Sequence, residues 1–150
     1  NNVLGLPSGT LGTDVLTAGK KQLTTKYPNV SQIEGEKVIS IAIKNGFNIV
    51  KTTKNEYKAQ VIVFALNYAK PFLIKGLEAY LEPHQKAKAS KDRIQLRNEN
   101  YLVTEGVYVC GTLSGCRSQF AIAAGSGANV ATDILTLWNN GEHSQVHDKI

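Results

Sequence analysis

The sequence predicts an α/β fold in which a mostly parallel sheet carries a three-stranded meander and a long helix closes the chain. Three observations support this prediction. Residues 37–66 contain three runs rich in β-branched residues, and Asn45-Gly46 between the first two is the strongest short signal for a hairpin turn. Residues 61–66 are continuously apolar, as in a strand that is covered on both faces. Residues 107–139 change from a strand pattern to a helical one.

Length and composition favour one domain over residues 1–150, which can bury about two thirds of its unfolded surface without a metal or disulfide. The net charge of +5 is spread along the chain. We expect the basic run of residues 86–93 to be a solvated face, and we expect no nucleic-acid partner. No apolar run reaches the roughly 20 residues of a membrane span, and no segment resembles a signal peptide. A cytoplasmic location without membrane association is therefore the default expectation.

The first half of the chain is predicted as one helix followed by strands. The helix covers residues 13–25, with Thr13 as its N-cap. Its inward-facing side chains are expected to be Val15, Leu16, Ala18 and Leu23. A short strand around residues 30–33 would be a parallel neighbour in the sheet, and the meander follows with strands over residues 37–44, 47–53 and 57–66.

The segment between the meander and the last strand is predicted to be mostly irregular. Residues 71–81 suggest a loop with one short helix, and residues 84–90 are polar and expected to be mobile. Residues 93–97 alternate as an exposed edge strand would. Residues 142–150 are predicted to form a polar tail.

The last part of the chain reads as strand, glycine turn and helix. Residues 107–109 predict a short buried strand, a turn begins at Gly111, and the helix covers residues 118–139 with Gly141 as its stop signal. Gly125 and Gly127 each cost about 1 kcal/mol in a helix interior, which favours a close approach of a neighbouring backbone or a ligand. The helix start would direct unpaired N–H groups and a partial positive charge at whatever lies over residues 111–119.

This stretch resembles the closing motif of the thioredoxin-reductase-like flavoproteins, in the pyridine nucleotide-disulfide oxidoreductase superfamily. Their pattern is a strand, an Ala-Gly-Asp turn, a variable loop, Arg-Gln, and a helix that begins with Ala-Ala and carries two glycines. Gly111 matches the turn glycine and Gln119 the glutamine, and Ala123-Ala124-Gly125 and Gly127 fall at the same spacing. Thr112 stands where the family has the aspartate that holds the flavin ribityl chain, and its hydroxyl can still hydrogen-bond a ribityl oxygen.

The resemblance implies a Rossmann-like FAD-binding domain and a flavin-dependent oxidoreductase that transfers electrons or hydride. The implied cofactor-binding residues are Asn2, Gly111, Thr112, Gln119, Phe120 and Ala123, and no catalytic residue is assigned. The family's Gly-x-Gly-x-x-Gly fingerprint, its first βαβ unit and its Cys-x-x-Cys dithiol are not evident in this sequence. The adenine-binding half would come from residues outside the sequence or from a partner chain. A homo-oligomer and a small-molecule or protein redox partner are the other expected partners.

The cysteines and histidines leave alternatives open. The resemblance implies that Cys110 is a buried structural thiol. The alternative is that Cys110 and Cys116 open and close as a redox pair. His84, His143 and His147 are expected on the surface, and with two cysteines they make no recognisable metal site. The alternative to a flavin enzyme is a cofactor-free, degenerate FAD domain that acts as a subunit or interaction module.

Overall fold

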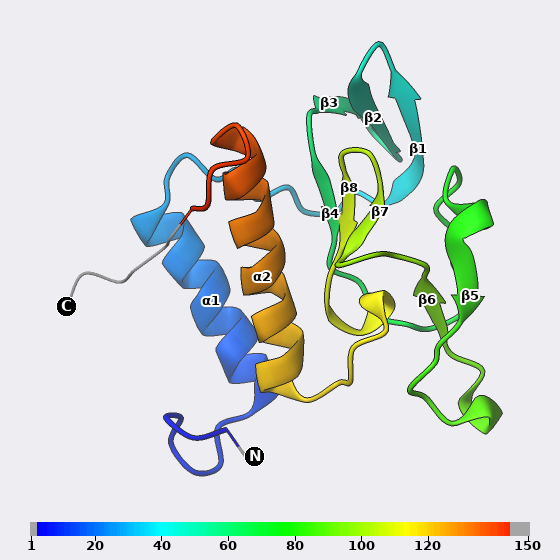
Figure 1. Ribbon diagram of the computed structural model, residues 1–150. Helices are drawn as coiled ribbons and strands as arrows, with labels where there is room; N and C mark the ends of the chain where they lie inside the picture. The colour runs from blue at the N-terminus through cyan, green and yellow to red at the C-terminus, as the bar shows by residue number, and fades with distance from the viewer. Residues whose placement is uncertain (1–2, 145–150) are drawn as a thin grey trace. The chain divides into compact units, whose positions relative to one another are not determined.

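The computed structural model describes residues 3–144, and the chain forms two compact units, residues 1–36 and 37–150 (Figure 1). The organisation of residues 1–150 as one domain stays a prediction. The first unit contains α1 (Gly12–Lys26), which begins where the Asp14 carboxylate accepts a hydrogen bond from the Leu11 N–H at 3.1 Å. The predicted Thr13 N-cap is therefore wrong. No side chain of α1 is buried, so the predicted inward face is also wrong, and residues 30–33 form no strand.

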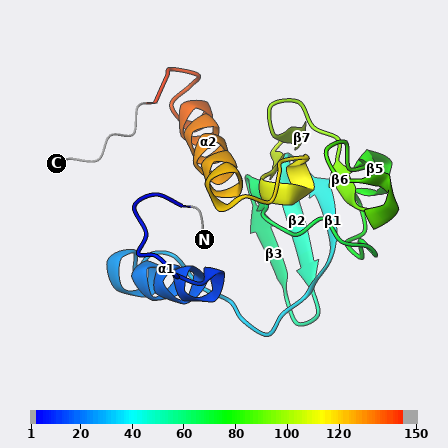
Figure 2. The same cartoon turned by 90° about the horizontal axis from the view of Figure 1, so that it is seen from below.

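The second unit opens with an antiparallel meander of β1 (Val38–Lys44), β2 (Phe47–Thr52) and β3 (Glu56–Ala59), seen side by side in Figure 2. Asn45 and Gly46 join the first two strands with φ angles of 51° and 74°. Positive φ at both central residues is what a two-residue type I′ hairpin requires. The hairpin predicted from Asn45-Gly46 is confirmed.

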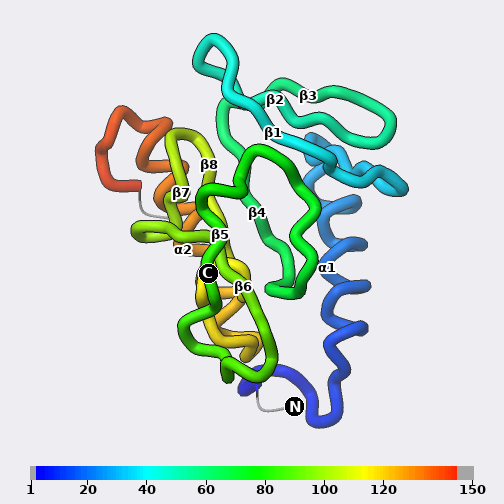
Figure 3. The backbone as a smooth tube through the Cα atoms, turned by 90° about the vertical axis from the view of Figure 1, so that its right-hand side faces the viewer, coloured from blue at the N-terminus to red at the C-terminus, as the bar shows by residue number. Residues whose placement is uncertain are grey.

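Two further small sheets follow. In one, β4 (Ile62–Phe64) pairs in parallel with β8 (Val107–Val109), and β8 pairs antiparallel with β7 (Leu102–Thr104). In the other, β5 (Leu81–Pro83) and β6 (Ile94–Leu96) form an antiparallel pair (Figure 3). Short 3₁₀ turns lie at η1 (Glu78–Tyr80), η2 (Ala89–Lys91) and η3 (Gly111–Ser114).

The predicted Rossmann-like fold with a mostly parallel sheet is wrong. Among the strands of residues 3–144, β4 and β8 form the only parallel pair, and every other strand pair is antiparallel. The predicted third strand, residues 57–66, is split, because β3 stays in the meander while β4 joins β8. Antiparallel strands need only short turns, whereas each parallel strand needs a crossover connection from a distant part of the chain. Among the named strands of residues 3–144 only β8 meets that need, and Lys75 adds one isolated parallel bridge to Ser40 of β1.

The hydrophobic core is organised around β8, which is buried on both faces. Val107 and Val109 point into the larger cluster, with Phe64, Leu77 and Leu96. Tyr108 points to the opposite face, where it packs with Val130 and Ile134 of α2 (Phe120–Trp138). The two-residue period of a strand explains this alternation. The predicted strand over residues 107–109 and the long helix after it are therefore confirmed.

The helix α2 ends before Gly141, as the sequence predicts. Gly141 has a φ of 84°, and its N–H donates to the Thr136 carbonyl at 2.9 Å. A glycine in the left-handed region that bonds back into the last turn is a common helix stop.

The segment predicted as an exposed edge strand is instead buried. Ile94, Gln95 and Leu96 of β6 are all at most 6% exposed. Leu96 belongs to the core, and the Gln95 side-chain amide donates to Glu82 Oε1 at 2.7 Å. A buried amide is tolerated here because its polar atoms have partners.

Candidate functional site

The turn after β8 is fastened to the second turn of α2. Gly111 has a φ of 68°, and its N–H donates to Ser126 Oγ at 2.7 Å. The Ser126 hydroxyl donates in turn to the Ala123 carbonyl at 2.7 Å. The N–H of Gly111, which is one of the predicted cofactor-binding residues, is therefore satisfied within the protein.

The residues predicted to bind the cofactor fall into two groups. Gly111 and Thr112 lie in the turn, close to Ala123, while Gln119 and Phe120 lie exposed at the start of α2. Gln119 is the N-cap residue. Asn2 lies outside the described residues. Whether any of them holds a cofactor stays a prediction.

The two helix glycines have no close neighbour. No atom outside their own stretch of helix lies within 4 Å of a Cβ built at Gly125 or Gly127. The expected close approach of a neighbouring backbone is thus not seen. A ligand or a partner remains as an explanation for the small residues on this helix.

A cavity of about 250 Å³ lies beside the start of α2. The loop between β8 and α2 contributes Cys116, Arg117, Ser118 and Gln119 to its wall. The loop between β5 and β6 contributes Lys86, Lys88 and Lys91. Three lysines of the basic run that we predicted to be a solvated face therefore line a cavity.

His84 holds the β5–β6 loop in place. It is 7% exposed, so the predicted surface histidine is wrong. Its backbone N–H donates to the Arg93 carbonyl at 2.9 Å, and its Nδ1 accepts the backbone N–H groups of Lys86 and Ala87, both at 3.1 Å. Nothing in the sequence of this polar segment distinguishes such a histidine from an exposed one.

Gln95 links this loop to the turn after β8. Its Oε1 accepts the Gln85 N–H at 3.0 Å, and a Cβ built at Gly115 would lie 2.7 Å from the same oxygen. With a φ of 87°, Gly115 also occupies the left-handed region, which favours glycine. One buried amide is thus hydrogen-bonded to the β5–β6 loop and packs closely against Gly115 in the loop after β8.

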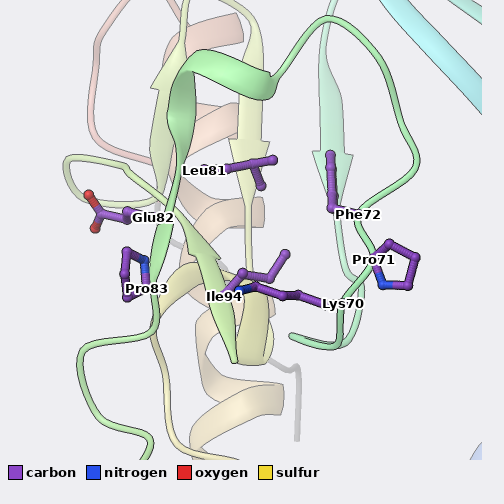
Figure 4. A pocket seen from close by; sticks show the side chains of 7 residues that line it. All are labelled: Lys70, Pro71, Phe72, Leu81, Glu82, Pro83 and Ile94. Carbon is purple, nitrogen blue, oxygen red and sulfur yellow. The ribbon is translucent and has the colours of Figure 1, made fainter. Parts of the chain in front are cut away.

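A larger cavity of about 430 Å³ is mostly apolar (Figure 4). Leu81 and Ile94 lie on one side of it and Phe72 on the other, while Glu82 points away. The charged groups of its wall are engaged, since Lys70 pairs with Asp92 and Glu82 accepts from Gln95. This cavity offers volume but few polar groups for orienting a ligand, so the cavity at the start of α2 is the better candidate site.

The two cysteines differ in their surroundings. Cys110 is 6% exposed, and burial, with a smaller contribution from Cys116, raises the pKa of its thiol. Cys116 is half-buried in the wall of the cavity, with Ser114 Oγ 3.3 Å and the Tyr101 hydroxyl 4.0 Å from its Sγ. Burial, followed by the contact with Cys116, raises the pKa of Tyr101. The low exposure of Cys110 confirms that this thiol is buried. Both thiols are free, and the redox switch stays a prediction.

We expect iodoacetamide to modify Cys116 first in the native protein. Alkylation requires the thiolate, and Cys110 has both a raised pKa and little exposed surface. Peptide mass spectrometry at about pH 8 should show Cys110 reacting at least about tenfold more slowly. In denaturant the two rates should become similar. Equal rates in the native protein would contradict this difference in environment.

No group of three or more His, Cys, Asp and Glu side chains within residues 3–144 is arranged to hold a metal ion. On length and composition alone, α2 could cross a membrane. Its buried residues Ser126, Val130 and Ile134 nevertheless face the rest of the second unit.

Neither protein-family models nor curated proteins give a match to this chain.

Proposed function

We propose that the protein binds a flavin nucleotide at the start of α2 and uses it in electron or hydride transfer. The observation that carries the proposal is the local unit made by β4, β8 and α2. The parallel strands β4 and β8 end at the same edge of their sheet, and β8 leads through a glycine turn into a 19-residue helix. The first N–H groups of a helix have no partner within the helix, so its start favours anionic groups.

The residues at this place fit one end of such a ligand. The N–H groups of Phe120 and Ala121 have no hydrogen-bond partner among residues 3–144, so they are free to donate. Gln119 lines the cavity and could hydrogen-bond the flavin ring, whereas Thr112 lies in the turn outside the cavity wall, and its contact with the ribityl chain stays a prediction. The cavity of about 250 Å³ is smaller than the roughly 300–1,000 Å³ pockets that enclose drug-sized ligands. The adenine half of FAD would therefore need the partner chain or the residues predicted to lie outside this sequence.

A bound flavin would supply electron and hydride transfer. The protein's own contribution is electrostatic. The partial positive charge at the start of α2 stabilises negative charge on a group placed over Gln119, which would favour the reduced cofactor.

Flavin fluorescence tests this proposal. Titration with riboflavin, FMN or FAD should quench the fluorescence, and Gln119→Ala should weaken binding about fivefold by removing a hydrogen bond. Gln22→Ala is the matched control, because it makes the same change at an exposed position on α1. Unchanged fluorescence with all three flavins would contradict the proposal.

A second candidate is a cofactor-free subunit of a larger assembly. The observation in its favour is the exposed apolar surface of α2, made by Phe120, Ile122, Leu135, Leu137 and Trp138, which are 39–60% exposed. Apolar side chains gathered on one element favour a protein contact. The visible spectrum and the mass in solution separate the two candidates. A colourless protein with a mass well above the 16.3 kDa of one chain would favour the subunit.

A further inference from the structure

We infer that the cavity at the start of α2 is a binding site for a small phosphate-type anion, such as a phosphate monoester or a pyrophosphate. This inference goes beyond flavin binding, because it is carried by the cationic side chains and the buried histidine of the cavity wall, and none of these depends on a flavin. Four side chains of the wall are cationic, namely Lys86, Lys88, Lys91 and Arg117, and none is acidic.

The first argument is the charge of the wall. None of these four cations forms an ion pair within residues 3–144, where the recorded pairs are Lys20–Glu34 and Lys70–Asp92. Like charges that face one cavity repel each other, and a cleft of one sign concentrates counter-ions. A bound anion would relieve this repulsion. The open start of α2 adds the unpartnered N–H groups of Phe120 and Ala121 beside the same cavity.

The second argument is an unpartnered donor on His84. Because its Nδ1 accepts two backbone N–H groups, the proton of the neutral ring is on Nε2. That Nε2–H is buried and has no hydrogen-bond partner. An unmade hydrogen bond at a buried polar atom is costly and calls for an explanation. His84 lines the cavity, so a small shift of its ring would present this donor to an acceptor bound there.

A second unpartnered donor lies close by. Arg93 Nε is also buried without a partner, and the Arg93 guanidinium lies 5.0 Å from the ring of Tyr68. Tyr68 lines the cavity and packs against His84 with ring centroids 5.2 Å apart. Arg93 itself is not in the cavity wall, so of these two donors only that of His84 belongs to a residue that lines the cavity.

The size of the cavity selects the class of ligand. About 250 Å³ is below the roughly 300–1,000 Å³ of pockets that enclose drug-sized molecules. Phosphate oxygens suit both point charges from lysines and the planar fork of Arg117. A single phosphate or pyrophosphate group therefore fits better than an extended polymer backbone, which would need a longer track of contacts.

Titration of ¹⁵N-labelled protein with inorganic pyrophosphate tests this inference. We expect the largest amide shifts at residues 84–91 and 116–121. Lys88→Ala/Lys91→Ala should weaken binding by about tenfold or more, because charge-assisted hydrogen bonds are lost. Lys51→Ala/Lys54→Ala is the matched control, since both lysines are exposed and neither lines the cavity. It should leave the affinity within about twofold at moderate salt.

His84→Asn examines the buried donor separately. An asparagine oxygen can accept the Lys86 and Ala87 N–H groups as Nδ1 does, but the residue has no group at the Nε2 position. The variant should keep its thermal unfolding midpoint close to that of the parent and lose pyrophosphate affinity. Equal loss in the cavity and control double variants, or shifts spread over all lysines, would overturn the site. Binding of RNA without binding of pyrophosphate would also overturn it. Both ligands would use the start of α2, but riboflavin carries no phosphate and pyrophosphate carries no flavin, so titrations with these two probes distinguish failure of one proposal from failure of the other.

Discussion

Gly76→Ala should lower the free energy of unfolding by about 3 kcal/mol or more, with a fall of roughly 10 °C in the unfolding midpoint. Gly76 has a φ of 96°, and an added Cβ would overlap the carbonyl oxygen of Ile41. The backbone cannot move away easily. The adjacent Lys75 donates to the Ile39 carbonyl and accepts from the Ile41 N–H, both at 2.9 Å.

Thermal unfolding followed by circular dichroism measures this loss. Gly46→Ala is the matched control, because Gly46 also has a positive φ, 74°, but no atom lies within 4 Å of its added Cβ. It should cost only the conformational strain, about 1 kcal/mol. Similar losses in the two variants would show that the contact with Ile41 is unimportant.

Asn48→Asp should destabilise the protein by about 3–5 kcal/mol at neutral pH. Asn48 is 3% exposed, and its Nδ2 donates to the carbonyls of Gln60 at 3.0 Å and Gly106 at 3.1 Å. Gln60 lies two residues before β4 and Gly106 directly precedes β8, so one amide ties the meander to the parallel pair. A carboxylate of the same shape would lose both hydrogen bonds and place a buried charge beside two carbonyl oxygens.

The loss should shrink in acid. Burial beside carbonyls raises the pKa of the introduced carboxyl above its unfolded value of about 3.9, so the folded state binds more protons. Stability is then highest at low pH and falls as the pH rises through the folded pKa. Urea unfolding of variant and parent at about pH 4 and about pH 7 measures the difference. Asn29→Asp, at an exposed position, should change stability by less than about 0.5 kcal/mol. An equal loss at both pH values would contradict the buried-charge explanation.

The elements that the sequence predicts well are those whose pattern is local. Asn45-Gly46 specifies a hairpin because the turn itself needs two residues that accept positive φ. The strand over residues 107–109 and the helix with its stop at Gly141 follow from periodicity and one glycine. The buried Cys110 is different, because its burial is expected from the resemblance to the flavoprotein family and not from a local pattern.

The pairing of the strands could not be predicted from local patterns, which is why the predicted mostly parallel sheet is wrong. Residues 57–66 carry one continuous strand pattern, yet the chain uses them as two strands in two sheets. Asn48 marks the division by bonding to the Gln60 carbonyl, and β4 takes a partner, β8, from much later in the chain. The choice of partner depends on contacts between distant segments, which a local pattern does not contain.

The candidate site shows the same division. Gln119 at the start of a helix could be predicted, because the change of period and the turn before it are local. The cavity beside it could not, since it needs a loop from residues 84–91, a buried Gln95 and a glycine with positive φ to meet. The polar residues of this loop have the composition of a solvated surface, and only the packing of distant segments brings them to a cavity.

The sequence by itself thus determined the meander's first hairpin, the buried last strand and the long small-residue helix, because backbone propensities and side-chain period act over a few residues. The tertiary structure alone decided how many strands run parallel, that His84 is buried with an unpaired N–H, and that three lysines face one cavity. Each of these depends on which distant segments bury one another, and that choice is made by the free energy of the whole packed unit.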